Sequence, residues 1–107
     1  MPDSAPSVIF TATSPAQAAP MPPLINFVTF IKLEARVVIA MPTKDVNEDD
    51  LGNLVNIKVF FGPTGSDLAS VVPVEFPGNY PPGSQQTVVV PVPNYSVSYD
   101  FEVEVGI

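Results

Sequence analysis

The side chains best suited to chemistry lie in one acidic stretch near the middle of the chain. Asp45, Asn47 and Asp49 stand at every second position, which is the spacing that opens a calcium-binding D-x-N-x-D loop. The rest of that motif is absent, because Asp50 stands where the loop needs a glycine and Asn56 where it needs a bidentate glutamate. We therefore expect a solvated loop without a tightly bound metal, and a calcium site is the alternative.

Catalytic groups are scarce elsewhere. The chain has no histidine and no cysteine, which removes the commonest general base and the thiolate nucleophile. The stretch GPTGSD lacks the spacing of a serine nucleophile elbow. Asp100, Glu102 and Glu104 recur at period two, so they would share the exposed face of a strand, where they keep an edge soluble. We expect no enzymatic activity and no cofactor.

Composition limits the classes of partner. The 107 residues suit one small domain, and 46% hydrophobic with 14% charged residues is unlike a disordered chain. Four Lys and Arg against 11 Asp and Glu give a net charge of −7, so nucleic acid and anionic membrane surfaces are disfavoured as partners. The N-terminus lacks a signal-peptide pattern. We expect a soluble protein made in the cytoplasm, and a secreted chain without its signal would look the same.

Alternation of apolar and polar residues predicts strands throughout. Residues 24–41 alternate at period two, with apolar side chains at the odd positions, and form either one long bent strand or two strands. Further strands are predicted over residues 54–61, 68–76, 85–93 and 98–107. Pro73 places the strand over residues 68–76 at the edge of a sheet. Residues 77–84 read as a turn cluster. The pattern indicates an all-β sandwich of about six to eight strands.

The inward positions of these strands supply the predicted core. It comprises Ile31, Leu33, Val37, Ile39, Ile57, Val59, Phe61, Val88, Val90, Tyr99, Phe101 and Val103. Tyr80 and Tyr95 lie in proline-rich turns and are predicted to be exposed. Because exposed aromatic side chains can bind sugars, a carbohydrate-binding platform is a further alternative.

The first 23 residues form a separate segment, here named the N-terminal arm. It holds six of the 14 prolines and five alanines, and residues 7–13, SVIFTAT, resemble a short strand. Residues 14–23 favour an extended polyproline-II linker. The predicted organisation is an arm over residues 1–23 and a β-sandwich over residues 24–107. A disordered tail is the alternative interpretation.

Three stretches carry a resemblance to a known family: VVIAMP (residues 37–42), LVNIKVFF (54–61) and VPVPNYSVSYDFEVEV (90–105). Their order and spacing resemble the second, third and penultimate strands of a fibronectin type III domain, an immunoglobulin-like β-sandwich. The resemblance implies that Tyr99 is the corner tyrosine, whose hydroxyl bonds to upstream backbone. Ile39 stands where the family usually has tryptophan. No counterpart of the family's last strand follows Val105, and a complete domain would need roughly 10–15 more residues.

A strand without a neighbour on one side exposes unpaired N–H and C=O groups. We expect the strand-like part of the arm, from the same chain or from a neighbouring subunit, or an unrelated strand, to cover that edge by strand addition. The candidate partner-binding residues are Ser7, Val8, Ile9, Phe10 and Thr11 in the arm and Tyr99, Phe101, Val103 and Val105 in the last strand.

These features together favour a structural protein that works in an assembly. The chain resembles the small immunoglobulin-like accessory proteins of bacteriophage virions, such as capsid decoration, neck or tail-fibre proteins. That resemblance implies a virion location, an oligomeric assembly, and a capsid or tail lattice or other copies of the chain as partners. The alternative is an extracellular adhesion or carbohydrate-binding module of a larger surface protein.

Overall fold

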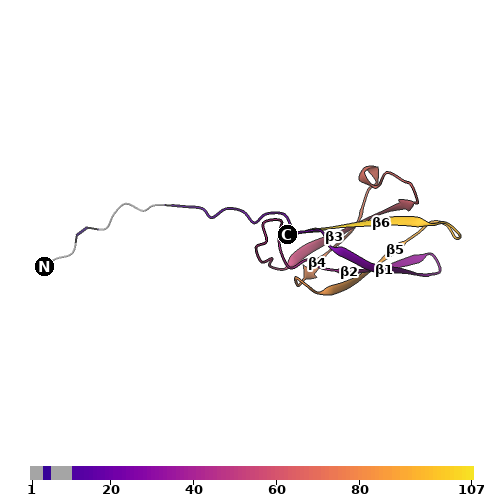
Figure 1. The fold of residues 1–107 in the computed structure, drawn as a ribbon, viewed down its shortest axis with the longest axis horizontal. Coiled ribbons are helices and arrows are strands. Elements are labelled where there is room, and N and C mark those ends of the chain that lie inside the picture. Colours follow the sequence, from indigo (N-terminus) through magenta and orange to yellow (C-terminus); the bar gives the residue numbers. More distant parts are fainter. Residues whose placement is uncertain (1–3, 6–10) are drawn as a thin grey trace.

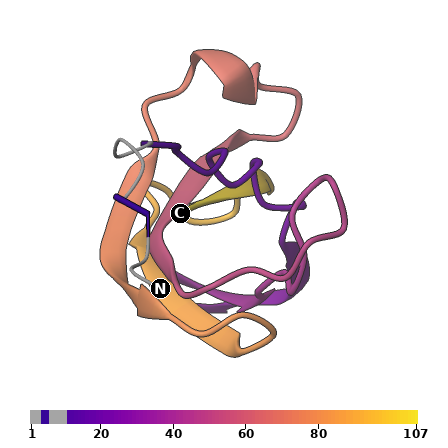
Figure 2. The same cartoon turned by 90° about the vertical axis from the view of Figure 1, so that its left-hand side faces the viewer.

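The computed structural model describes residues 4, 5 and 11–107 and contains two three-stranded antiparallel sheets (Figures 1 and 2). One sheet has the order β1-β2-β5 and consists of β1 (Leu24–Ile31), β2 (Glu34–Ala40) and β5 (Gln85–Pro91). The other has the order β4-β3-β6 and consists of β3 (Leu54–Pro63), β4 (Val74–Tyr80) and β6 (Tyr99–Gly106). Helix is limited in the described residues to one short 3₁₀ turn, η1 (Leu68–Ser70). The prediction of an all-β protein is confirmed.

The long alternating stretch forms two strands joined by a tight turn. Ile31 pairs with Glu34, and Lys32 has a φ of 55° between them, a left-handed conformation that is uncommon outside glycine. A β-bulge between Ile25 and Phe27 shifts the alternation within β1. Because one extra residue reverses the side-chain parity, Ile25 is half-buried whereas Phe27 and Ile31 are exposed. The prediction that Ile31 faces inward is therefore wrong.

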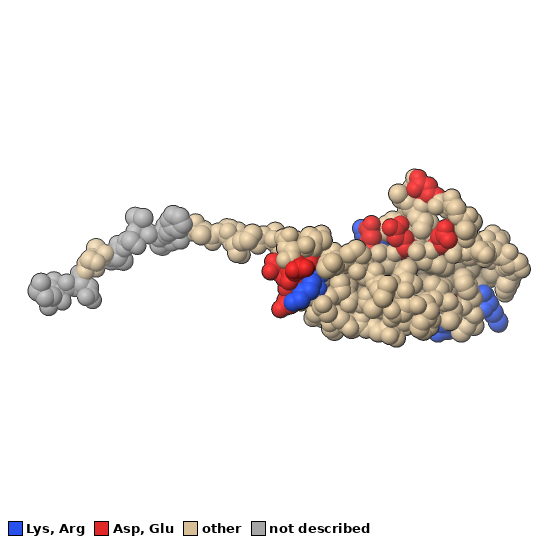
Figure 3. All heavy atoms as spheres, in the orientation of Figure 1, with Lys and Arg blue, Asp and Glu red and all other residues tan. Residues whose placement is uncertain are grey.

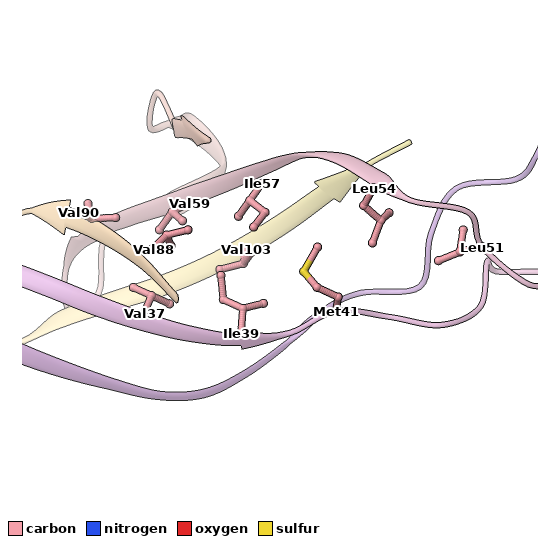
Figure 4. Close-up of a cluster of buried hydrophobic side chains, with 10 residues drawn as sticks. All are labelled: Val37, Ile39, Met41, Leu51, Leu54, Ile57, Val59, Val88, Val90 and Val103. Atoms are coloured by element: carbon pink, nitrogen blue, oxygen red, sulfur yellow. The ribbon is translucent and has the colours of Figure 1, made fainter. Parts of the chain in front are cut away.

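The core lies between the two sheets (Figure 4). Seven predicted core residues are buried there: Val37, Ile39, Ile57, Val59, Val88, Val90 and Val103. Phe61 and Phe101 are partly buried and pack against this cluster. Ile31 is 52% exposed and does not belong to the core. The prediction omitted Ala35, Val38, Met41, Leu51, Leu54 and Val92, all of which are buried.

The strand predicted over residues 68–76 begins later and extends further. Its first part forms η1, and β4 continues through Pro77 and Gly78 to Tyr80, where a turn cluster was predicted. A register shift opposite Leu54 and Asn56 accommodates this stretch. β4 pairs with β3 alone among the described residues, and an edge position is where a strand tolerates proline.

The first described residues of the arm project away from the sheets. Residues 11–17 are exposed and extended, and Figure 1 shows them leaving the domain at the end where β6 finishes. We name the end of the sandwich from which these residues leave the arm end. The opposite, hairpin end carries the turn between β1 and β2 and the start of β6. No helix among the described residues is long and apolar enough to cross a membrane.

Candidate functional site: the free edge of β6

β6 has a neighbouring strand on one side only within the described part of the chain. It pairs with β3 along its whole length, with Val103 opposite Val59 and Val105 opposite Ile57. Val103 is buried, Val105 is half-buried, and Glu102 and Glu104 are exposed. The alternation predicted for this strand is therefore present. Its second edge offers main-chain donors and acceptors to an added strand.

A groove of about 380 Å³ runs beside this edge. One wall is β6 from Glu102 to Val105, and the other is formed by residues 19–23, which lead into β1. Most of its exposed lining is apolar. Its position therefore permits an extended segment to pair with β6 and to place alternate side chains against the core.

Aromatic side chains close the same side of the sandwich at the hairpin end. Phe30 of β1 lies 6.5 Å from Tyr99 and 6.3 Å from Phe101, measured between ring centroids. Phe61 of β3 packs on the same two rings at 6.2 and 6.0 Å. These separations are favourable for aromatic pairs. The aromatic cluster therefore lies beside the first residues of β6, and the groove lies beside Glu102 to Val105.

Tyr99 makes the hydrogen bonds that the family resemblance implies. Its hydroxyl donates to the carbonyl of Asn94 at 3.3 Å and accepts from the N–H of Asn94 at 3.2 Å. The side chain thereby ties the start of β6 to the loop that precedes it. Its role is to position β6 and its edge.

The candidate partner-binding residues fall into two groups. Tyr99, Phe101, Val103 and Val105 lie on the inward face of β6, beside the groove or the aromatic cluster. Thr11 is exposed in the projecting segment, and residues 7–10 lie outside the described residues. Residues 11–17 lead away from β6 of their own chain (Figure 1).

A second feature, missed in the sequence, anchors the root of the arm. The Gln17 side chain donates to Oδ2 of Asp45 at 3.3 Å and to the carbonyl of Asp50 at 2.8 Å. Backbone bonds add to it, since Ala19 accepts from Val46 and Met21 donates to Lys44. The acidic loop therefore holds residues 17–21 in place.

Asp45 is the centre of that loop and is 1% exposed. Its Oδ1 accepts from the N–H of Asn47 at 2.8 Å and of Asp49 at 3.0 Å, an arrangement that closes the turn. The D-x-N-x-D spacing is thus explained by turn formation, and tight calcium binding would have to displace these bonds. The absence of a tight metal stays a prediction, tested by calorimetry with calcium on the native chain and on Asp45→Ala.

The same contacts set the protonation of Asp45. Burial acts to raise its pKa, but the hydrogen bonds from Asp49, Gln17 and Asn47 outweigh burial, and the pKa lies below the ordinary value of 3.8. A carboxyl whose pKa is lowered on folding stabilises the fold above its unfolded-chain pKa, and that contribution disappears as pH falls through the lower folded value. The arm root should therefore stay anchored at neutral pH and loosen only in strong acid.

We expect the amide signals of Asn47, Asp49 and the Gln17 side chain to shift together on acidification, with a midpoint below pH 3.8. NMR titration of the native chain measures this midpoint. Gln17→Ala removes one of the stabilising donors, so its midpoint should move upward toward the ordinary value. A native midpoint at or above 3.8 would contradict the assigned hydrogen bonds.

The two tyrosines predicted to be exposed differ in the structure. Tyr95 is 65% exposed at the hairpin end. Tyr80 is half-buried, and its hydroxyl donates to the carbonyl of Phe76 at 2.7 Å. The ring covers Gly78 so closely that a Cβ there would lie 2.9 Å from it. The prediction is wrong for Tyr80, because the turn cluster in which it was placed is part of β4.

Comparison with known proteins adds no relative. No protein-family model, no curated protein and no solved structure matches the chain.

Proposed function

We propose that this chain is a non-enzymatic structural protein that joins an assembly by accepting a β-strand along β6. The observation that carries the proposal is the edge of β6 that pairs with no other described residue and lies beside an apolar groove. An added strand there would satisfy main-chain groups of β6 and cover the half-buried side chain of Val105. The binding site would consist of the groove and of the main-chain donors and acceptors along the edge of β6. It requires no catalytic group.

We further propose that the fold is fibronectin type III-like. Immunoglobulin constant-type domains place their first, second, fourth and fifth strands in one sheet and the third, sixth and seventh in the other. The sheet β1-β2-β5 corresponds to three strands of the first set and β3 with β6 to part of the second, whereas β4 differs because it pairs with β3. The Tyr99 hydroxyl contacts support the same assignment. In that scheme an added strand would take the seventh position, next to β6.

The proposed setting is a virus particle, in which the protein serves as a capsid decoration, neck or tail-fibre accessory protein. Support comes from the acidic composition, the small sandwich, and the extended segment anchored at one end of it. A single added strand contributes modestly, because each hydrogen bond is worth only about 0.5–1.5 kcal/mol net. Many equivalent contacts in a regular array would make such binding effective.

Labelling of particles tests the setting. An antibody against residues 24–107 should mark virus particles purified from cultures that express the chain, at regularly repeated positions in immunogold electron microscopy. Signal confined to the cell surface would contradict the virion assignment and favour the adhesion-module alternative.

Hydrogen exchange tests the mode of binding. Amides of β6 should exchange more slowly in the assembled state than in the free chain, because an added strand would engage them. β2, which is paired on both sides in the free chain, is the internal control and should change little. Equal exchange of β6 in both states would contradict strand acceptance.

A further inference from the structure

We propose that the strand accepted by β6 is residues 7–13 of a second copy of this chain. The inference rests on the proposed function, since it names the occupant of the same groove. The segment that precedes the sheets contains one apolar, strand-like run, SVIFTAT. Residues 7–10 of this run lie outside the described residues, residues 11–13 are exposed, and the contacts at the arm root decide where the run can reach.

The arm root sets the direction of the arm. Gln17, Ala19 and Met21 are fixed to the acidic loop by hydrogen bonds. From Gln17 toward the N-terminus the described residues lead away from the arm end, where β6 also finishes (Figure 1). To reach its own β6 the arm would have to reverse within residues 14–16 and then run parallel to β6. Every strand pairing within both sheets is antiparallel.

A second copy avoids this reversal. If its arm end faces the hairpin end of the acceptor, its arm passes the edge of β6 at Tyr99, reaches the groove beside Glu102 to Val105 and runs antiparallel to β6. Ten residues, 7–16, span about 33 Å when extended, and the eight residues of β6 span about 27 Å. The arm of a neighbouring copy is therefore long enough to cover the whole edge without leaving its anchor.

One register places three apolar side chains of the arm inward and Ile9 on the outer face opposite Glu104. With Val8 opposite Val105, Phe10 falls opposite Val103 and Ala12 opposite Phe101, so that all three face the core. The same register places Thr11 beside Glu102 on the outer face, because side chains alternate along a strand.

Charge selects the arm over another copy of β6. Figure 3 shows acidic side chains gathered over the outer surface of this sheet, where Glu102 and Glu104 are exposed. Pairing β6 with a second β6 would bring two such rows together and cost free energy. Residues 4–23 contain no charged side chain, so the arm meets this row without repulsion.

Such an exchange makes every copy both donor and acceptor. Because the donated and accepting surfaces differ, the contact is heterologous and can propagate head to tail. It would also bring the arm end of the donor to the hairpin end of the acceptor. The side chains of Phe30, Ile31 and Tyr95 at that end are 50%, 52% and 65% exposed. The exposed apolar surface at that end would then be covered.

Disulfide trapping tests the occupant, since the native chain has no cysteine. We expect the full-length double variant Thr11→Cys/Glu102→Cys to form a ladder of covalent oligomers on mild oxidation, which reductant collapses to monomer. The matched control is Thr11→Cys/Thr87→Cys, with the second cysteine on the exposed face of β5, and it should give little ladder. Circular dichroism melts verify that both variants fold, and all three positions are exposed.

The remaining outcomes overturn the inference. An intramolecular disulfide in a monomer would show that the arm occupies its own groove. Equal ladders in both variants would indicate that the cysteines meet by random collision and that the arm has no specific binding site on β6. If no disulfide forms but the β6 amides are protected from exchange in purified particles, β6 still accepts a strand. That result would show that another protein supplies the strand. Absence of both the disulfide and this protection would remove the proposed function as well.

Discussion

Replacing Ile39 with alanine should lower the free energy of unfolding by about 2–5 kcal/mol, the range for buried aliphatic residues truncated in a close-packed core. The Ile39 side chain is fully buried between the sheets (Figure 4). Truncation removes apolar contacts and leaves a cavity that the surrounding strands cannot fill completely. Urea denaturation followed by far-ultraviolet circular dichroism measures the difference between the variant and the native chain.

Ile31→Ala is the matched control for this prediction. The same substitution is made in the same hairpin, but Ile31 is 52% exposed, so the loss should stay within about 0.5 kcal/mol. Similar losses at both positions would show that the bulge in β1 does not turn Ile31 outward. A loss below about 0.5 kcal/mol at Ile39 would mean that the inward and outward faces of β2 are reversed.

Deleting residues 1–16 should leave a folded domain that no longer enters its assembly. The deletion retains Gln17 and the backbone bonds at the arm root, so unfolding should remain cooperative. It removes Val8 and Phe10, each worth about 1.5–3 kcal/mol if fully buried. Association costs offset much of that gain, so assembly depends on many arms at once. Without them the free edge of β6 should make the truncated domain prone to aggregate.

Deletion of residues 1–5 is the control, because it keeps residues 7–13 and should preserve assembly. Light scattering at several concentrations and incorporation into particles report the two variants side by side. A variant lacking residues 1–16 that stays monomeric, soluble and fully competent for assembly would show that the arm is only a tail. Loss of assembly in both variants would locate the essential residues in the first five.

Some of the fold could be predicted because it depends on local alternation. Period two over β2, β3 and β6 identified Val37, Ile39, Val59 and Val103 as inward-facing, since side chains alternate by covalent geometry. The same reasoning failed in β1, where the bulge after Ile25 reverses the parity. A bulge depends on how two strands meet, and no glycine in β1 signals it.

The candidate site divides in the same way. The apolar face of β6 and the acid row on its other face were readable from SYDFEVEVGI. The groove formed with residues 19–23 was not, because its walls are about 80 residues apart in sequence and meet only in the folded domain. The anchor between Gln17 and Asp45 was missed for the same reason, with a separation of 28 residues. The short D-x-N-x-D spacing suggested a metal, whereas the tertiary contact shows that its first carboxylate closes a turn and holds the arm.

The sequence by itself determined the class of the protein: an acidic all-β chain without histidine or cysteine, with strands whose apolar faces require a second sheet to cover them. Only the tertiary structure decided which strands lie at the edges, where the groove lies, and at which end the arm leaves. Alternation specifies the two faces of a strand but carries no information about its lateral neighbours, because any strand's backbone can pair with any other. The free edge of β6, and the direction from which an arm can reach it, are therefore properties of the assembled sheets.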